Sequence, residues 1–349
     1  MLSFYEGDSI LQNLICTLDA VCQAIGLTYD MKVHHISLLT GDFEQNFHFY
    51  VDILGLRLVK NSINQGNIYM RHVYYGDFLG SAGTVVTFFP DHRFGQERID
   101  GKSALTGIKF GIPRGSRQFW TNRLAKFITD SSVNMTNSLS VRDFDQIPLE
   151  FIETDDILTD WHINTLTDIP AEFQITGVLG TTLLTDHIDA TTRFLKDMVG
   201  DFSAITLEKT ENNLPVSKWG RGSVDHIAFA VESTAELDAI WKKAERLDYT
   251  REAYVDRGYF SSVYLLTPSG NRIEFATLTP GFTLDESVRE LGTTFALPPR
   301  YEARRGELLR YFGRQGEHFD KVKPAKFDEN VTVKINQIRP RTNTSGTCY

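Results

Sequence analysis

The sequence predicts an α+β protein built from four modules of the order βαβββ that pair into two cups. Three observations lead to this prediction: two similar strands at 33–38 and 224–229, weaker copies of both near residues 105 and 178, and a capped helix pattern after the outer two strands. Such a repeat builds a fold from copies of one supersecondary unit, because each copy needs a neighbour to bury its apolar face.

Ungapped alignment of the chain with itself defines the four copies. The sequence ISLLT after His35 falls on TTLLT after Gly180, and IAFAV after His226 falls on IKFGI after Gly107. Each copy begins with a short apolar strand, enters a helix after a turn, and returns through runs rich in Val, Tyr and Phe. This succession is typical of a βαβββ unit.

The helices of the first and fourth copies carry clear start and stop signals. Asp42 with Gln45, and Ser233 with Glu236, have the spacing of a capping box, and Gly55 follows the first helix as a stop. Apolar residues at helical spacing predict the buried faces. These residues are Phe43, Phe47, Tyr50, Val51 and Leu54 in the first copy and Leu237, Ile240 and Trp241 in the fourth.

Matching strands of the first and fourth copies carry His35 and His226. Successive side chains of a strand point to opposite faces, so each histidine shares its face with small neighbours, which leaves room for a metal and a ligand. The fourth copy turns at 267–270 (TPSG), where Pro and Gly suit a tight reversal, and this places Glu274 on its last strand. Two imidazoles and one carboxylate make a three-ligand metal site with open positions.

Only the outer copies supply these ligands. The first copy has Thr87 at the position of Glu274, and the second has Glu150 there without a histidine. Copies two and three have Gly107 and Gly180 at the first-strand positions. We therefore expect one functional cup built from the first and last copies, and one degenerate cup in which Glu150 is a relic.

The chain resembles the vicinal oxygen chelate superfamily, and within it the ring-cleaving dioxygenases that act on hydroquinones. The resemblance runs from about residue 31 to about residue 297 and implies the glyoxalase/extradiol dioxygenase fold. It rests on the segments 34–37 (HHIS), 54–60 (LGLRLVK), 74–77 (YYGD), 83–90 (GTVVTFFP), 257–260 (RGYF) and 280–283 (PGFT).

The resemblance implies a role for each matching residue. His35, His226 and Glu274 correspond to ligands of Fe(II), with Mn(II) as the alternative ion. Arg257 and Tyr264 correspond to the substrate-side residues of the last copy. This chain has Asp225 where relatives commonly carry a further histidine, so no role is assigned to that position.

The chemistry of ring cleavage fits this set of residues. Three ligands on one face leave positions at which Fe(II) can bind an aromatic hydroxyl and dioxygen side by side. Arg257 can stabilise negative charge, and Tyr264 can donate a hydrogen bond or carry a proton. His34 is the third candidate catalytic residue, although strand alternation turns it away from His35. His72, on a tyrosine-rich strand, is interpreted as structural or solvent-facing.

Three functions compete at this level. The first is Fe(II)-dependent, extradiol-type cleavage of a hydroquinone or a related dihydroxylated aromatic. The second is a glyoxalase-type metal-dependent isomerase or transferase, since one fold hosts several reactions. The third is a protein that sequesters an aromatic compound. Thr87 in place of a fourth ligand favours the first over the second, and sequestration needs no ligand triad.

Composition agrees with a globular enzyme. The chain has 349 residues, 41% hydrophobic and 23% charged, with a formal net charge of −9. That length suits two paired-module domains, and the negative charge argues against nucleic-acid or anionic-membrane binding. Cys16, Cys22 and Cys348 form neither a disulfide framework nor a zinc motif. We expect a cytoplasmic enzyme whose partners are a small aromatic substrate and O2, with assembly into a homo-oligomer left open.

The ends of the chain differ from the repeats. The first eight residues have no basic side chain, which argues against a secretory signal, and no apolar run is long enough to span a membrane. The predicted parts are an extension over 1–30 with an amphipathic helical pattern, modules over 31–102, 103–155, 174–222 and 223–279, a C-terminal segment over 280–325 that packs on the modules, and a loose polar tail over 326–349.

Overall fold

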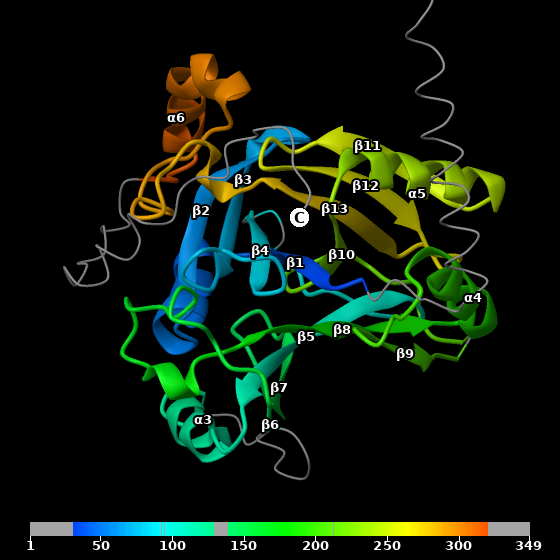
Figure 1. Cartoon of the computed structure of the whole chain (residues 1–349), viewed down its shortest axis with the longest axis horizontal. Coiled ribbons are helices and arrows are strands. Elements are labelled where there is room, and N and C mark those ends of the chain that lie inside the picture. The colour runs from blue at the N-terminus through cyan, green and yellow to red at the C-terminus, as the bar shows by residue number, and fades with distance from the viewer. Residues whose placement is uncertain (1–30, 92, 94, 129–138, 212, 320–349) are drawn as a thin grey trace, which may run out of the picture.

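The computed structural model of the chain describes residues 31–91, 93, 95–128, 139–211 and 213–319 (Figure 1). The predicted N-terminal extension, the polar tail and all three cysteines lie outside these residues. Among the helices of the described ranges, none combines the length and apolar character needed to cross a bilayer.

The first and fourth copies have the full βαβββ order, while the inner copies are shorter. The first copy comprises β1 (Val33–Thr40), α2 (Phe43–Phe47), the π-helix η1 (His48–Ile53), β2 (Arg57–Asn64), β3 (Asn67–Gly76) and β4 (Val85–Pro90). The fourth comprises β10 (Val224–Val231), α5 (Thr234–Arg246), β11 (Thr250–Asp256), β12 (Phe260–Leu266) and β13 (Arg272–Pro280). The second comprises β5 (Ala104–Pro113), α3 (Arg117–Leu124), β6 (Leu139–Arg142) and β7 (Pro148–Thr154), and the third β8 (Gly177–Thr185), α4 (Ile188–Met198) and β9 (Ile205–Lys209).

Both inner copies depart from the predicted βαβββ order. Within the described residues, the second has two strands after its helix, β6 and β7, and the third has one, β9. In the third copy the reason is local: the segment 210–222 (TENNLPVSKWGRG) is polar, contains Pro and Gly, and lacks the alternation that a half-buried strand needs. Two isolated bridges, Glu97↔Arg221 and Ile99↔Lys218, hold it instead.

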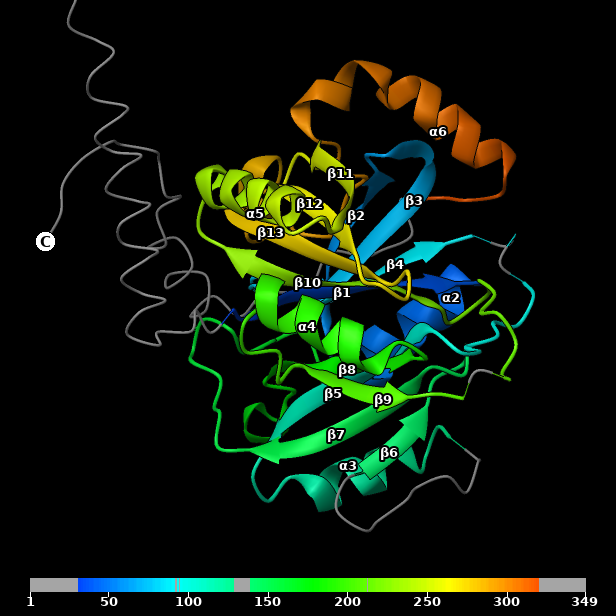
Figure 2. The same ribbon diagram turned by 90° about the vertical axis from the view of Figure 1, so that its right-hand side faces the viewer.

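The copies pair as predicted, the first with the fourth and the second with the third. One sheet has eight strands in the order β11-β12-β13-β10-β1-β4-β3-β2, and the other has five in the order β6-β7-β5-β8-β9. Figure 2 shows the two sheets as layers, with β1 and β10 above β8 and β5. The larger sheet curls, so that β3 and β12 come to lie across from one another (Figure 1).

The capping predictions are confirmed, and the first helix has an unexpected turn. Asp42 accepts a hydrogen bond from the Gln45 amide at 2.9 Å, and Ser233 accepts one from the Glu236 amide at 3.3 Å. After Phe47 the first helix continues as a π-helix. This wider turn moves Phe49 into the fully buried face, where the α-helical stripe did not place it.

The segment after β13 packs on β2 and β3, and its described part ends at Phe319. It consists of η4 (Phe282–Leu284), η5 (Pro299–Arg304) and α6 (Arg305–Arg314). The fully buried Lys60 of β2 lies 2.5 Å from Asp285 and 2.6 Å from Glu286, and this pairing offsets the cost of burying its charge. An apolar cluster of Ile63, Phe295, Leu297, Leu308, Phe312 and Phe319 completes the contact.

One buried carboxylic acid, in the turn after β6, links the second copy to the helix of the first copy. The Tyr50 hydroxyl donates to Asp143 at 3.0 Å, and burial raises the pKa of Asp143 to about 7. Because the pKa of this group is higher in the folded than in the unfolded state, the group contributes stability at pH values below its unfolded pKa. This contribution is lost as the pH rises through the folded pKa.

We therefore expect the wild-type free energy of unfolding to fall between about pH 4 and pH 7 relative to that of Asp143→Asn. The difference should be on the order of a few kcal/mol, since one pKa unit is worth about 1.4 kcal/mol. Urea unfolding of both proteins across this pH range measures it. Parallel pH profiles would contradict the assignment.

Candidate metal centre

Three side chains from three strands bring one donor atom each to a single point. Nε2 of His35 lies 3.2 Å from Nε2 of His226 and 3.4 Å from Oε2 of Glu274, and His226 Nε2 lies 2.7 Å from the same oxygen. All three side chains are buried. They are the one group with metal-ligand geometry in the part of the chain that the structure describes.

Strand pairing explains the convergence. Across β1, β10 and β13, His35 stands opposite Ala228, which stands opposite Glu274. His226 lies two residues before Ala228 and therefore shares its face of β10. The small Ala228 side chain between the outer two residues leaves the space into which the two imidazoles and the carboxylate project.

His226 is held from behind by a carboxylate. Its Nδ1 lies 2.5 Å from Oδ2 of Asp225, and Oδ1 of Asp225 accepts from Arg272 at 2.6 Å. Burial opposes a charged imidazole here, but Glu274 and Asp225 outweigh it and raise the pKa of His226 to about 9. A hydrogen bond at Nδ1 directs Nε2 toward Glu274.

His35 is held by its neighbour His34, contrary to the expectation from strand alternation. Nδ1 of His34 lies 2.9 Å from Nδ1 of His35. The pairing of β1 with β10 shifts register between Val33 and His35, and such an irregularity breaks the regular alternation of side chains. Burial first, and then the neighbouring His35, lower the pKa of His34 to about 3, so His34 is neutral. Its position behind the ring suits orientation of His35, and a catalytic part for it stays a prediction.

The two oxygens of Glu274 have different neighbours. Oε1 accepts a hydrogen bond from Ser262, while Oε2 is buried and faces Nε2 of His226 and Nε2 of His35. Burial by itself would raise the pKa of Glu274, but His226 and His35 hold it well below its usual range. A buried, ionised oxygen that faces two imidazole nitrogens is suited to a divalent cation, which all three atoms can bind together.

A cavity of about 420 Å³ opens beside this group, with His35 and His226 in its wall. Arg257 and Tyr264 line it, as the sequence predicted, and Arg257 Nε donates to the Tyr264 hydroxyl at 3.2 Å. Asn64, at the end of β2, also lines the cavity and lies 3.4 Å from Arg257, so the two ends of the curled sheet meet there. Burial first, and then Glu274, raise the pKa of Tyr264 well above 10, so its hydroxyl keeps its proton near neutral pH.

His72, interpreted from the sequence as structural or solvent-facing, is buried and also lies in the wall of this cavity. His72 and Tyr74 line the wall on the β3 side, and Nδ1 of His72 lies 2.7 Å from the Tyr74 hydroxyl. Nε2 of His72 contacts Thr87 at 2.8 Å, and Thr87 in turn contacts Ser37. The alternation of His72 and Tyr74 on one face of β3 was a signal for this role.

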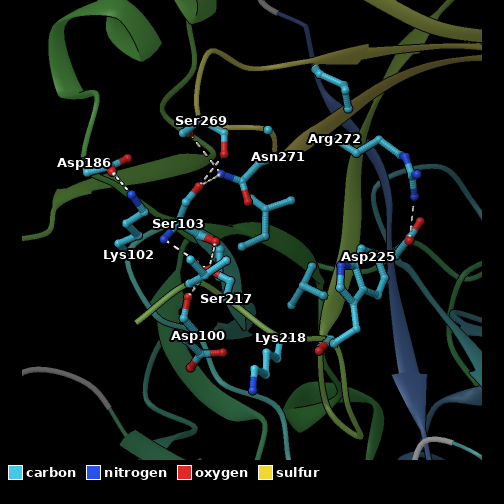
Figure 3. Close-up of a pocket in the computed structure, with 18 of the residues that line it drawn as sticks. Asp100, Lys102, Ser103, Asp186, Ser217, Lys218, Asp225, Ser269, Asn271 and Arg272 are labelled. Atoms are coloured by element: carbon cyan, nitrogen blue, oxygen red, sulfur yellow. Dashed lines mark hydrogen bonds and ion pairs between the residues drawn. The ribbon is translucent and has the colours of Figure 1, made fainter. Parts of the chain in front are cut away.

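A larger cavity of about 510 Å³ lies between the fourth copy and the inner copies (Figure 3). It shares Asp225 and Arg272 with the wall of the smaller cavity. Several of its polar groups already bond with one another, because Lys102 pairs with Asp186 and the Ser103 hydroxyl donates to a backbone oxygen. Its size therefore does not make it the reactive site.

Backbone geometry keeps histidines out of the degenerate cup at its two first-strand positions. Gly107 and Gly180 both have positive φ, and a Cβ at Gly180 would lie 1.8 Å from the carbonyl oxygen of Ala204. A Cβ at Gly107 would lie 2.9 Å from the carbonyl oxygen of Pro148. Histidine does not fit at either position, so Glu150 of this cup has no partners of the kind that Glu274 has.

Known proteins are similar to the chain in sequence over most of its length, although no family model matches it. MhqA of Bacillus subtilis (strain 168), which is named as a ring-cleaving dioxygenase, is 31% identical over 304 residues, covering 79% of this chain and 96% of MhqA. A chlorohydroquinone/hydroquinone 1,2-dioxygenase of Sphingobium indicum is 28% identical over 313 residues, covering 80% of this chain and 94% of that enzyme.

Solved structures agree with these relatives. A crystal structure named as a dioxygenase of Bacillus subtilis subsp. subtilis str. 168 has a TM-score of 0.73 and 27% identity, covering 81% of this chain and 97% of that one. Glyoxalase I of Zea mays, at 12% identity and a TM-score of 0.50 over 71% of this chain and 93% of its own, shares the fold. Because the chain has this fold and repeat and is 31% identical to MhqA over 96% of that protein, it belongs to the ring-cleaving dioxygenases of the vicinal oxygen chelate superfamily.

Proposed function

We propose that this protein is an Fe(II)-dependent, extradiol-type dioxygenase that cleaves the ring of a hydroquinone or a related dihydroxylated aromatic. The observation that carries the proposal is the convergence of His35, His226 and Glu274 beside a cavity that also presents Arg257 and Tyr264. The Sphingobium relative, whose name specifies hydroquinones, supports this substrate class.

The residues that would hold the ion are the three converging donors. Bound there, Fe(II) would supply open coordination positions for a phenolic oxygen and dioxygen, and Mn(II) would suit the same donors as the alternative ion. In the net reaction the ring bond between a hydroxyl-bearing carbon and its neighbour breaks, and both atoms of O2 enter the product. In a hydroquinone this bond has a hydroxyl at one end only, because the two hydroxyls stand opposite one another on the ring.

The protein's own side chains orient the ring and handle its proton. Tyr264 packs edge-on against His226, with ring centroids 5.4 Å apart, and its protonated hydroxyl can donate to a substrate oxygen. Arg257 bonds that hydroxyl and places a positive charge at the cavity wall, where it stabilises a phenolate. Phe89 and Phe260 supply apolar surface for a flat ring in the same cavity.

The test is an assay of protein loaded with Fe(II) under anaerobic conditions and then given methylhydroquinone or catechol with O2. We expect oxygen uptake with methylhydroquinone and a ring-opened product that carries both atoms of labelled O2. Binding of the aromatic without oxygen uptake would favour sequestration. Anaerobic conversion of a glutathione hemithioacetal would favour a glyoxalase-type reaction.

A further inference from the structure

Behind the candidate centre, a chain of charged side chains leads away from His226. Asp225 bonds Nδ1 of His226 with one oxygen and Arg272 with the other, and Arg272 also pairs with Glu252 at 2.5 Å. The Asp225 side chain is 13% exposed and the His226 side chain 4%. Figure 3 shows Arg272 and Asp225 facing one another at the edge of the larger cavity.

The two histidines of the centre occupy matching places in the first and fourth copies, yet they are supported differently. His35 faces the neutral ring of His34 across 2.9 Å. His226 faces the carboxylate of Asp225 across 2.5 Å. A carboxylate that accepts from Nδ1 keeps a proton on that nitrogen, so that Nε2 is the atom a metal binds when it displaces the proton there, and makes the ring a stronger ligand.

We propose that Asp225 is a positioning residue that holds His226 in its ligating tautomer and raises the metal affinity of the centre, with Arg272 keeping the carboxylate in place. This inference rests on the proposed function only in that the three donors hold a divalent ion. Asp225 is not a fourth donor, because its two oxygens bond Nδ1 of His226 and the Arg272 guanidinium.

Arg272 is held by two carboxylates, those of Asp225 and Glu252. An ionised Asp225 in a largely buried position needs a countercharge, and the guanidinium supplies it at 2.6 Å. Glu252 accepts hydrogen bonds from Nε and Nη2 of the same guanidinium, both at 2.5 Å. Arg272 is thereby fixed between Glu252 and Asp225, and the Asp225 carboxylate is aimed at His226.

The test measures metal affinity and does not depend on turnover. Mn(II) is titrated into full-length apo-protein by equilibrium dialysis, for wild type, Asp225→Asn and Asp225→Leu. Asp225→Asn keeps the shape and an acceptor but loses the charge, so Kd should rise by about 10-fold. Asp225→Leu loses the acceptor too, and Kd should rise toward about 100-fold. Thermal unfolding of each metal-free variant shows whether it is folded.

The matched control is Asp186→Asn, a carboxylate on another wall of the larger cavity that pairs with Lys102 (Figure 3). It should bind Mn(II) as the wild type does. Wild-type affinity in folded Asp225→Asn and Asp225→Leu would overturn the inference. If His226→Ala lost Mn(II) in the same titration, the metal centre itself would still be supported. A wild-type protein that binds no Mn(II) or Fe(II) would overturn both this inference and the proposed function.

Discussion

Glu274→Gln is expected to lose most of the bound iron and to reduce oxygen-dependent turnover by about 10³-fold or more. A metal ion contributes several kcal/mol of transition-state stabilisation, and each 1.36 kcal/mol is a factor of about ten in rate. The amide keeps the shape and can still accept from Ser262, but it removes the charge that faces His35 and His226. Iron content and initial oxygen consumption measure the two effects.

The control for this variant is Glu150→Gln in the degenerate cup. Glu150 lies on β7, and Gly107 and Gly180 stand where that cup would need histidines. Iron content and activity should match the wild type. Full activity in Glu274→Gln, or iron loss in Glu150→Gln alone, would show that the reactive cup is the other one.

Tyr264→Phe is expected to retain iron and to lower kcat on the order of 10²–10⁴-fold, the usual contribution of a positioned proton donor. The hydroxyl keeps its proton because burial and Glu274 raise its pKa, and it lines the cavity next to Arg257. Phenylalanine preserves the packing on His226 while it removes the donor. Single-turnover rates of iron-loaded protein isolate the chemical step.

Tyr75→Phe serves as the matched control for the loss of a tyrosine hydroxyl. Tyr75 is fully buried on β3, and its hydroxyl has no hydrogen-bond partner within the described ranges. This variant should keep the wild-type rate. If Tyr264→Phe also kept it, the proton would have to come from another group, of which His72 in the cavity wall is one candidate.

The three donors could be predicted from sequence because their placement depends on backbone pattern alone. The repeat fixes which strands are equivalent, and alternation fixes the face on which His35, His226 and Glu274 lie. The pairing of the outer copies then follows from the census of ligands. None of these steps requires knowledge of a side-chain contact.

The supporting residues could not be predicted in the same way. The contact of His34 with His35 depends on a register shift in β1, which the sequence does not mark. The orientation of Asp225 depends on Arg272, 47 residues further along the chain. The position of His72 in the cavity wall depends on the curl of the sheet. The π-turn after Phe47 has no local signal either, since its residues also fit an α-helix.

A crystal structure of the protein loaded with Fe(II) under anaerobic conditions, with anomalous data collected at the iron edge, tests the metal assignment most directly. We expect one strong peak between Nε2 of His35, Nε2 of His226 and Oε2 of Glu274, with distances of roughly 2.0–2.3 Å to each. An iron peak at any other place, with these three atoms left without metal, would contradict it.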